Sequence, residues 1–149
     1  MAQCKGNKHI GMEVKILSNL IDRKMNERIT GDVQTEGLTP MQSMVIRYLE
    51  ERGEDEPVFQ RDIERAFDIR RSTATAILQL MEKNGLITKE PVDYDARLKR
   101  IHMLPKAMAA ENRIREIIQA FETEIKAGIS DGELAIFMEI LEKLKANVK

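Results

Sequence analysis

The sequence has few of the residues that cross-link a chain or perform chemistry. Its 149 residues include one cysteine, Cys4, two histidines and no tryptophan. A single cysteine excludes a disulfide within the chain. The sequence also has no close-spaced Cys/His pairs, no phosphate-binding glycine loop, no HExxH motif and no nucleophile elbow. We therefore expect no metal, no cofactor and no catalytic residue, and interpret the chain as a protein other than an enzyme.

Long apolar runs are missing as well. No stretch has the length and hydrophobicity of a membrane span, and residues 1–12 lack the apolar core of a signal peptide. We therefore expect a cytoplasmic protein with no membrane partner. Hydrophobic residues make up 42% of the chain and charged residues 33%, which is typical of a globular domain with a packed core.

There is no excess of either charge. The chain carries 24 basic and 25 acidic residues, for a net charge of −1, whereas nucleic-acid binders usually have a basic excess. The distribution is uneven, however. Residues 69–81 and 96–110 contain arginine or lysine and no acid, so positive charge is gathered in the middle of the chain.

Apolar residues at steps of three and four predict an amphipathic helix over residues 9–30. Residues 31–37 are polar and predict a linker. A second helix should begin at Thr39-Pro40-Met41-Gln42, because threonine caps, proline suits the first helical position and glutamine completes a capping box. Gly53 should end it.

The middle of the chain predicts a winged helix-turn-helix. A short helix around Phe59 and Phe67 is followed by a break at residues 68–69. The next helix, residues 71–84, should bury four apolar residues and end at Gly85. Two strands, residues 86–89 and 98–104, should flank a turn at residues 91–96. The four residues expected in the core are Ala74, Ile77, Leu78 and Met81.

Two further helices complete the chain. One follows Pro105, and the other begins at the capping box Ser130-Asp131-Gly132-Glu133. The apolar stripes of these helices and of residues 9–30 are long for a chain of this size. We therefore expect them to pack against a second copy in a two-fold homodimer, with Ile117 in the seam.

Three motifs together resemble the MarR family of bacterial transcriptional regulators. They are the stretch from Arg70 to Ile87, the triplet Asp95-Ala96-Arg97, and Leu38-Thr39-Pro40-Met41-Gln42. The resemblance implies a single, mainly α domain (residues 1–149) with a small β-wing. Within it, residues 38–104 would be the winged helix-turn-helix DNA-binding lobe, and residues 9–30 and 105–149 the dimerisation helices. It also implies a repressor that binds a pseudo-palindromic operator and is relieved by a small aromatic or phenolic effector.

The resemblance identifies the start of the 71–84 helix as the DNA-reading surface. Helix-turn-helix proteins present the N-terminal residues of this helix to the bases, and a helix N-terminus favours phosphate. Ala76 stands where the family often has a basic residue, and Arg70 and Arg71 can replace that contact to DNA. The predicted DNA-binding residues on this helix are Arg70, Arg71, Ser72, Thr73, Thr75 and Gln79.

The wing supplies the other predicted contacts. Arg97, near the hairpin tip, can enter the minor groove of DNA, where narrow A·T-rich stretches attract arginine. Asp95 would be repelled by phosphate, so we expect it to hold Arg97 or a neighbouring basic side chain in position. Successive strand residues face opposite ways, so Lys99 and Arg100 should not both face DNA, and Lys99 is the predicted contact.

Several alternatives stay open at this point. Cys4 suggests a DNA-binding redox sensor, although a free thiol without a role fits the sequence better. A winged helix can also bind a protein instead of DNA. Met12, Met41, Met44 and Met108 could border an adaptable effector pocket or simply fill the core, so the effector-binding residues remain unassigned.

Overall fold

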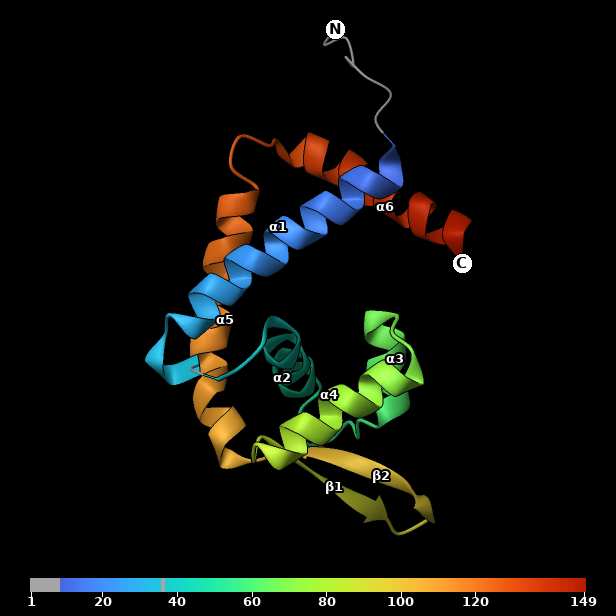
Figure 1. Cartoon of the computed structure of the whole chain (residues 1–149). Helices are drawn as coiled ribbons and strands as arrows, with labels where there is room; N and C mark the ends of the chain where they lie inside the picture. The colour runs from blue at the N-terminus through green and yellow to red at the C-terminus, as the bar shows by residue number, and fades with distance from the viewer. Residues whose placement is uncertain (1–8, 36) are drawn as a thin grey trace, which may run out of the picture. The chain divides into compact units, whose positions relative to one another are not determined.

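A computed structural model describes residues 9–35 and 37–149, which form six α-helices, one short 3₁₀ helix and one antiparallel strand pair (Figure 1). The winged-helix fold class is therefore confirmed. The chain divides into two compact units, Met1–Ile117 and Ile118–Lys149. None of the helices in the described residues has the length and apolar character needed to cross a membrane.

The first helix and the segment after it differ in how well the sequence predicted them. Helix α1 (Ile10–Thr30) agrees with the prediction and buries Met25 and Ile29 near its end. The following residues are not a simple linker, because they contain the 3₁₀ helix η1 (Val33–Thr35). The buried Thr35 hydroxyl donates a 2.7 Å hydrogen bond to the Ile29 carbonyl, which ties this turn back to α1.

Helix α2 (Pro40–Arg52) begins as its capping motif predicts. The Thr39 hydroxyl accepts from the Gln42 backbone N–H, and the Gln42 side-chain oxygen accepts from the Thr39 N–H, each at 3.1 Å. Gly53 ends the helix with a φ of 69°, a left-handed value that glycine adopts without strain. The helix buries Val45, Ile46 and Leu49.

Helices α3 (Gln60–Phe67) and α4 (Arg71–Lys83) form the helix-turn-helix. The sharp turn between them is made by Asp68, whose φ of 49° is tolerated by aspartate better than by most residues. Helix α4 buries Ala74, Leu78 and Met81. The prediction for Ile77 was wrong, because this side chain stays half-buried at the edge of the packed face.

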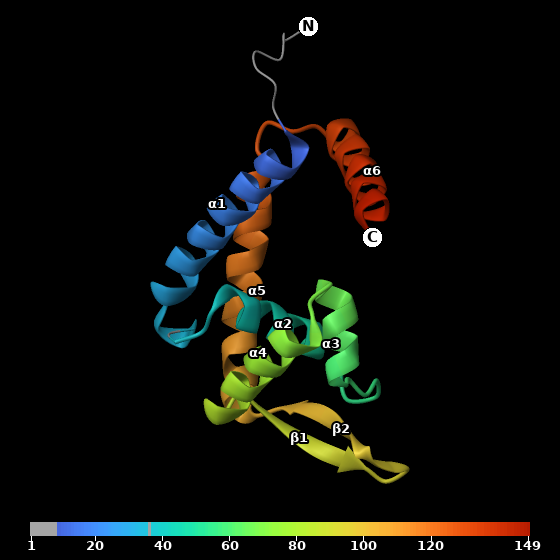
Figure 2. The ribbon, with the colours of Figure 1, turned by 45° about the vertical axis from the view of Figure 1, so that its right-hand side comes forward.

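The wing is a hairpin of β1 (Ile87–Val92) and β2 (Asp95–Met103), drawn below α4 in Figures 1 and 2. The predicted turn at residues 91–96 was too long. Pro91 pairs with Lys99 and Val92 with Asp95, so only two residues form the turn. Proline is tolerated here because a two-stranded sheet consists of edge strands, which need no second set of ladder hydrogen bonds.

Two features of the hairpin position its tip. The register jumps between Pro91 and Val92, which leaves residues 96–98 as a bulge opposite this step. Further along β2, the Ile101 N–H donates a 2.8 Å hydrogen bond to the Val58 carbonyl just before α3. The hairpin is therefore anchored to the helix-turn-helix at its base, while the bulge alters the course of the strand near the tip.

Helix α5 (Pro105–Ile125) begins directly after the wing. It buries Ala107, Ala110, Ile114 and Ile117. The expectation that Ile117 lies in a seam between subunits was wrong, because this side chain is already buried within a single chain. Burial on this helix stops at Ile117, whereas Ile125 near its end is exposed.

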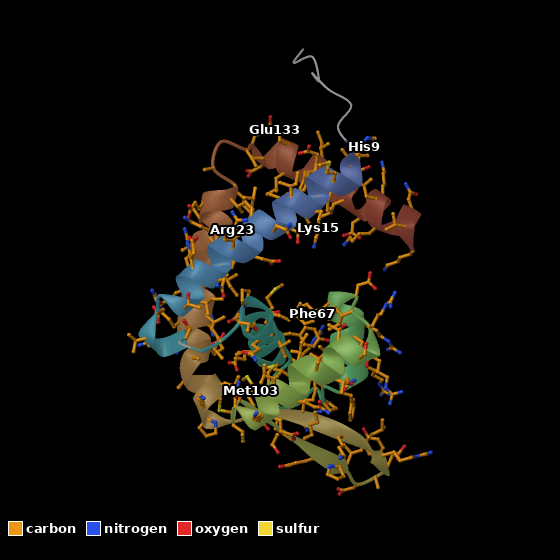
Figure 3. All side chains as sticks on the ribbon, viewed as in Figure 1. His9, Lys15, Arg23, Phe67, Met103 and Glu133 are labelled. Atoms are coloured by element: carbon orange, nitrogen blue, oxygen red, sulfur yellow. The ribbon has the colours of Figure 1, made fainter. Side chains whose placement is uncertain are left out.

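Helix α6 (Asp131–Val148) starts at the predicted capping box. The Ser130 hydroxyl accepts from the Glu133 N–H at 3.1 Å, and the Glu133 carboxylate accepts from the Ser130 N–H at 2.9 Å. These hydrogen bonds from the Ser130 backbone and side chain lower the pKa of Glu133. The helix has no buried residue: its three leucines are half-buried, and Ile136, Phe137, Met138 and Ile140 are exposed. Figure 3 marks Glu133 in the first turn of α6.

Candidate nucleic-acid interface

The N-terminal end of α4 is open to solvent and positively charged. Arg70 occupies the capping position without a side-chain cap, and the first turn contains no acid. Four predicted contacts, Arg70, Arg71, Ser72 and Thr73, are exposed there. Backbone N–H groups at an uncapped helix start can bind a phosphate, and the helix dipole adds to the attraction.

A groove of about 420 Å³ separates this helix start from the wing. Four of the predicted DNA-binding residues line it: Arg71, Thr75, Arg97 and Lys99. Arg70, Ser72, Thr73 and Gln79 are exposed on α4 but lie outside this groove. Its charged lining consists of five bases and one acid, namely Arg61, Arg71, Lys89, Arg97, Lys99 and Glu64. The groove is therefore strongly basic, although the chain as a whole has a net charge of −1.

The wing tip presents one arginine that is held by a neighbouring acid. The Arg97 side chain is 92% exposed. Asp95 Oδ1 accepts from the Arg97 backbone N–H at 2.9 Å and from Arg97 Nε at 3.4 Å. The contact that the sequence led us to expect is present, and its part in DNA binding stays a prediction. An ordered but exposed guanidinium suits insertion into a narrow minor groove.

Lys99 and Arg100 face opposite sides of the wing, as strand alternation requires. Lys99 is exposed and lines the basic groove. Arg100 instead donates a hydrogen bond to the Glu54 carbonyl on the far side of the hairpin. Of these two side chains, only Lys99 is free to approach a nucleic acid bound along the groove.

Two groove residues were missed by the sequence analysis. Gln60 and Arg61 open α3, and tertiary packing brings them against α4. Gln60 Nε2 donates to Thr75 Oγ1 at 2.9 Å, so one predicted contact already has a partner. The Arg61 guanidinium lies 5.1 Å from the centre of the Phe59 ring, a cation–π contact that holds it at the groove. No local sequence signal marks either residue, because the groove exists only once α3 and α4 pack.

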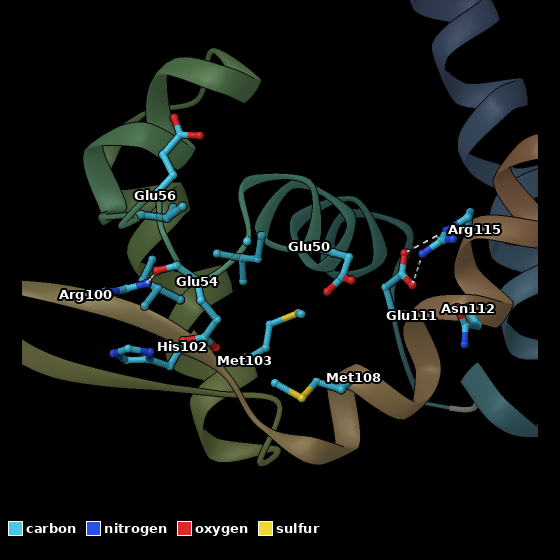
Figure 4. A pocket seen from close by; sticks show the side chains of 14 residues that line it. Glu50, Glu54, Glu56, Arg100, His102, Met103, Met108, Glu111, Asn112 and Arg115 are labelled. Atoms are coloured by element: carbon cyan, nitrogen blue, oxygen red, sulfur yellow. Dashed lines mark hydrogen bonds and ion pairs between the residues drawn. The ribbon is translucent and has the colours of Figure 1, made fainter.

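A second cavity, of about 390 Å³, lies on the other side of the wing between α2, β2 and α5 (Figure 4). Met103 and Met108 line it, and its lining also includes four glutamates and two arginines, namely Glu50, Glu54, Glu56, Glu111, Arg100 and Arg115. Of the four methionines considered from the sequence, only Met108 lines this cavity.

Glu111 supplies a buried charge at the wall of this cavity. Its carboxylate accepts hydrogen bonds of 2.7 Å from Arg47 on α2 and from Arg115 on α5. Burial alone would raise the pKa of Glu111, but the hydrogen bonds from Arg115 and Arg47 outweigh it and hold this pKa below the ordinary glutamate value. The ionised carboxylate therefore links α2 to α5 at neutral pH.

The remaining candidate sites gain little from the structure. Cys4 lies outside the described residues. Within those residues, no group of three or more histidine, cysteine or acidic side chains could hold a metal ion. His102 lies 3.4 Å from Glu90 across the hairpin, where the contact contributes to strand pairing.

Comparison with known proteins finds relatives of one kind. A family model described as the MarR family matches residues 36–98. The crystal structure of the transcription regulator MarR from Oenococcus oeni PSU-1 is 28% identical, with a TM-score of 0.78, over 93% of this chain and 99% of that one.

Two further structures share the fold at lower sequence identity. The S. aureus MepR–DNA complex is 17% identical, with a TM-score of 0.84, over 96% of this chain and all of that one. The PcaV transcriptional regulator from Streptomyces coelicolor, solved with its natural ligand, is 18% identical, with a TM-score of 0.82, over the full length of both chains.

Proposed function

We propose that this chain is a MarR-family transcriptional regulator that binds double-stranded DNA sequence-specifically as a homodimer, since the MarR family model matches residues 36–98. The observation that carries the proposal is the basic groove between α4 and the wing. The protein has no overall positive charge, yet five basic side chains line one groove next to the uncapped start of α4. That arrangement suits a phosphate backbone, with α4 in the major groove and Arg97 in the minor groove.

The dimer is supported by apolar side chains that remain exposed on the first and last helices. Ile10, Met12 and Leu20 of α1 and Ile136 and Phe137 of α6 are all exposed by about half or more. Two subunits related by a two-fold axis would present two α4 helices about 34 Å apart, one turn of DNA. The operator would then be a short pseudo-palindrome with half-sites spaced by one turn of DNA. The protein would act in the cytoplasm, where bacterial DNA lies.

The test is a titration of labelled DNA from upstream of the protein's own gene, followed by fluorescence anisotropy at several salt concentrations. We expect tight binding at low salt and a steep, log-linear loss of affinity as salt rises, because phosphate contacts release counterions. An unrelated duplex of equal length is the control. Equal affinity for the two duplexes would contradict sequence-specific binding.

We further propose that the protein is a repressor and that a small aromatic or phenolic acid relieves it by binding the cavity shown in Figure 4. The cavity volume falls within the range of small-molecule sites. Met103 and Met108 offer an adaptable apolar surface, and Arg115, which pairs with Glu111 through Nε and Nη2, can still donate from Nη1 to a ligand carboxylate. A ligand there would touch both β2 of the wing and α5, so it could bias the orientation of the DNA-binding surface.

Thermal shift with benzoate, phenol and 4-hydroxybenzoate tests this second proposal, followed by DNA titration in the presence of any stabilising compound. We expect the aromatic acids to raise the melting temperature and to weaken DNA binding. Met108→Asp should abolish both effects, because it places a negative charge beside the ligand carboxylate. Stabilisation that leaves DNA affinity unchanged would contradict relief by this ligand.

A further inference from the structure

The contact between Gln60 and Thr75 has a defined polarity. Gln60 Nε2 lies 2.9 Å from Thr75 Oγ1 and 3.4 Å from the Arg71 carbonyl oxygen. A carbonyl oxygen can only accept a hydrogen bond, so the amide nitrogen of Gln60, not its oxygen, must face α4. The Thr75 hydroxyl is therefore the acceptor in this pair.

This polarity determines what Thr75 can offer to a ligand. A hydroxyl has one proton to donate and two lone pairs that accept, and here Gln60 occupies one of these lone pairs. No hydrogen bond donated by the Thr75 hydroxyl is found within residues 9–35 and 37–149. Thr75 is half-buried and lines the basic groove together with Arg71 and Lys99. Its hydroxyl proton must point away from Gln60 and has no acceptor among the described residues, so it is available to a ligand in the groove.

We propose that Gln60 is a positioning residue that makes Thr75 a hydrogen-bond donor towards the base facing it, and so sets base preference at one operator position. In the major groove, guanine N7 and O6 and thymine O4 accept hydrogen bonds, whereas cytosine N4 donates. Opposite cytosine the hydroxyl proton would lose water without gaining an acceptor, so the protein should favour guanine or thymine over cytosine at that position. This inference rests on the proposed DNA-binding function and adds a specificity determinant to it.

Two substitutions at residue 60 separate polarity from packing. In Gln60→Glu the carboxylate only accepts, so the Thr75 hydroxyl must donate to it and present its oxygen to the DNA. The preference should then move towards cytosine N4 or adenine N6. Gln60→Met keeps the side-chain length without hydrogen bonding, so the hydroxyl can rotate and the preference should relax. Thr75→Val removes the hydroxyl while keeping the shape.

The measurement is selection of bound duplexes from a randomised library, followed by titration of duplexes that differ at one base pair. For the wild type we expect an affinity ratio of about 3- to 10-fold between the favoured base and cytosine, which one hydrogen bond can supply. Gln60→Glu should reverse this ratio. Its added negative charge should also weaken binding to all duplexes alike, and that uniform loss does not alter the ratio.

The Thr75→Val background completes the test. If Gln60 acts through Thr75, the effect of Gln60→Glu on base preference should vanish there, while the uniform loss persists. Should Gln60→Glu fail to fold, a relaxed preference in both Gln60→Met and Thr75→Val supports the proposal, and an unchanged preference in either overturns it.

Two other results would overturn the proposal. One is a Gln60→Glu variant that binds every duplex more weakly but keeps the wild-type base preference. The other is a change in base preference caused by Gln60→Glu that persists in the Thr75→Val background. A wild type that binds no duplex would overturn the proposed function as well, so the two failures are distinguishable.

Discussion

Arg47 on α2 and Glu111 on α5 form a 2.7 Å ion pair in which the glutamate side chain is only 4% exposed while the arginine side chain is 23% exposed. The same carboxylate also pairs with Arg115. A buried carboxylate is costly unless it is fully paired, and here two guanidinium groups satisfy it. This relationship ties α2 to α5, the helix that follows the wing.

Replacing Glu111 with glutamine should destabilise the fold. The substitution keeps the shape but leaves two arginines without their anion, and we expect a loss of about 1–2 kcal/mol in the free energy of unfolding. This is below the value of about 3–5 kcal/mol for breaking a fully buried pair, because both arginines reach solvent. Urea denaturation at a fixed protein concentration measures it.

The matched control is Glu51→Gln. Glu51 pairs with the same arginine, Arg47, at the same 2.7 Å, but its side chain is 61% exposed. Exposed pairs of this kind contribute little, so the control should lie within about 0.5 kcal/mol of the wild type. Equal losses in the two variants would show that burial of Glu111 is not the source of the effect.

The contribution of Glu111 should depend on pH in a defined direction. Its pKa is lowered in the folded state, so the unfolded chain takes up the proton first as the pH falls. The stabilisation is complete above the ordinary glutamate pKa of about 4.3 and is lost as the pH falls through the lower folded value. The stability gap between wild type and Glu111→Gln should therefore be constant from pH 8 to pH 6 and shrink below about pH 4.3. A gap that widens in acid would contradict this sign.

Arg97→Ala should weaken DNA binding about tenfold or more without changing the melting temperature. The side chain is almost fully exposed and pairs with Asp95, so its loss removes little packing. A well-placed arginine contributes about 1–3 kcal/mol to recognition of DNA. Fluorescence anisotropy with the operator duplex gives the affinity, and a thermal melt gives the stability.

Arg23→Ala on α1 is a suitable comparison for the wing variant. Arg23 is exposed and basic but does not line the groove between α4 and the wing. Its loss should change DNA affinity less than about twofold, since the charge lies outside the proposed contact surface and salt screens it. If Arg23→Ala and Arg97→Ala weaken binding equally, the wing has no special role.

Phe137→Asp should dissociate the proposed dimer without unfolding the Met1–Ile117 unit. Phe137 lies on α6, which has no buried residue, and half of its surface is exposed. A charge placed in an apolar interface is unfavourable, so sedimentation should shift towards the monomer. Circular dichroism should still show a helical protein.

Lys143→Asp serves as the control on the same helix. It introduces the same acid at an exposed position that carries no apolar side chain. This variant should remain dimeric. A monomeric wild type, or a Phe137→Asp variant that stays dimeric, would count against α6 as the dimer surface.

The local elements of this protein follow from the sequence because their causes are local. Thr39 and Gln42 cap α2, Ser130 and Glu133 cap α6, and Gly85 ends α4, each through contacts within a few residues. The periodicity of apolar residues was enough to predict each helix to within a residue or two. The basic stretches were also visible, since charge needs no fold to be counted.

Only the tertiary structure decided which helices and strands contact one another. Gln60 meets Thr75 across fifteen residues, and the Val58 carbonyl anchors β2 across forty-three, because packing of α3 and β2 brings these atoms together. Ile117 was expected in a subunit seam but is buried in its own unit, since an apolar stripe does not state which partner covers it. Sequence thus determined where helices begin and end and which residues carry charge, whereas long-range packing decided which of those residues share one groove.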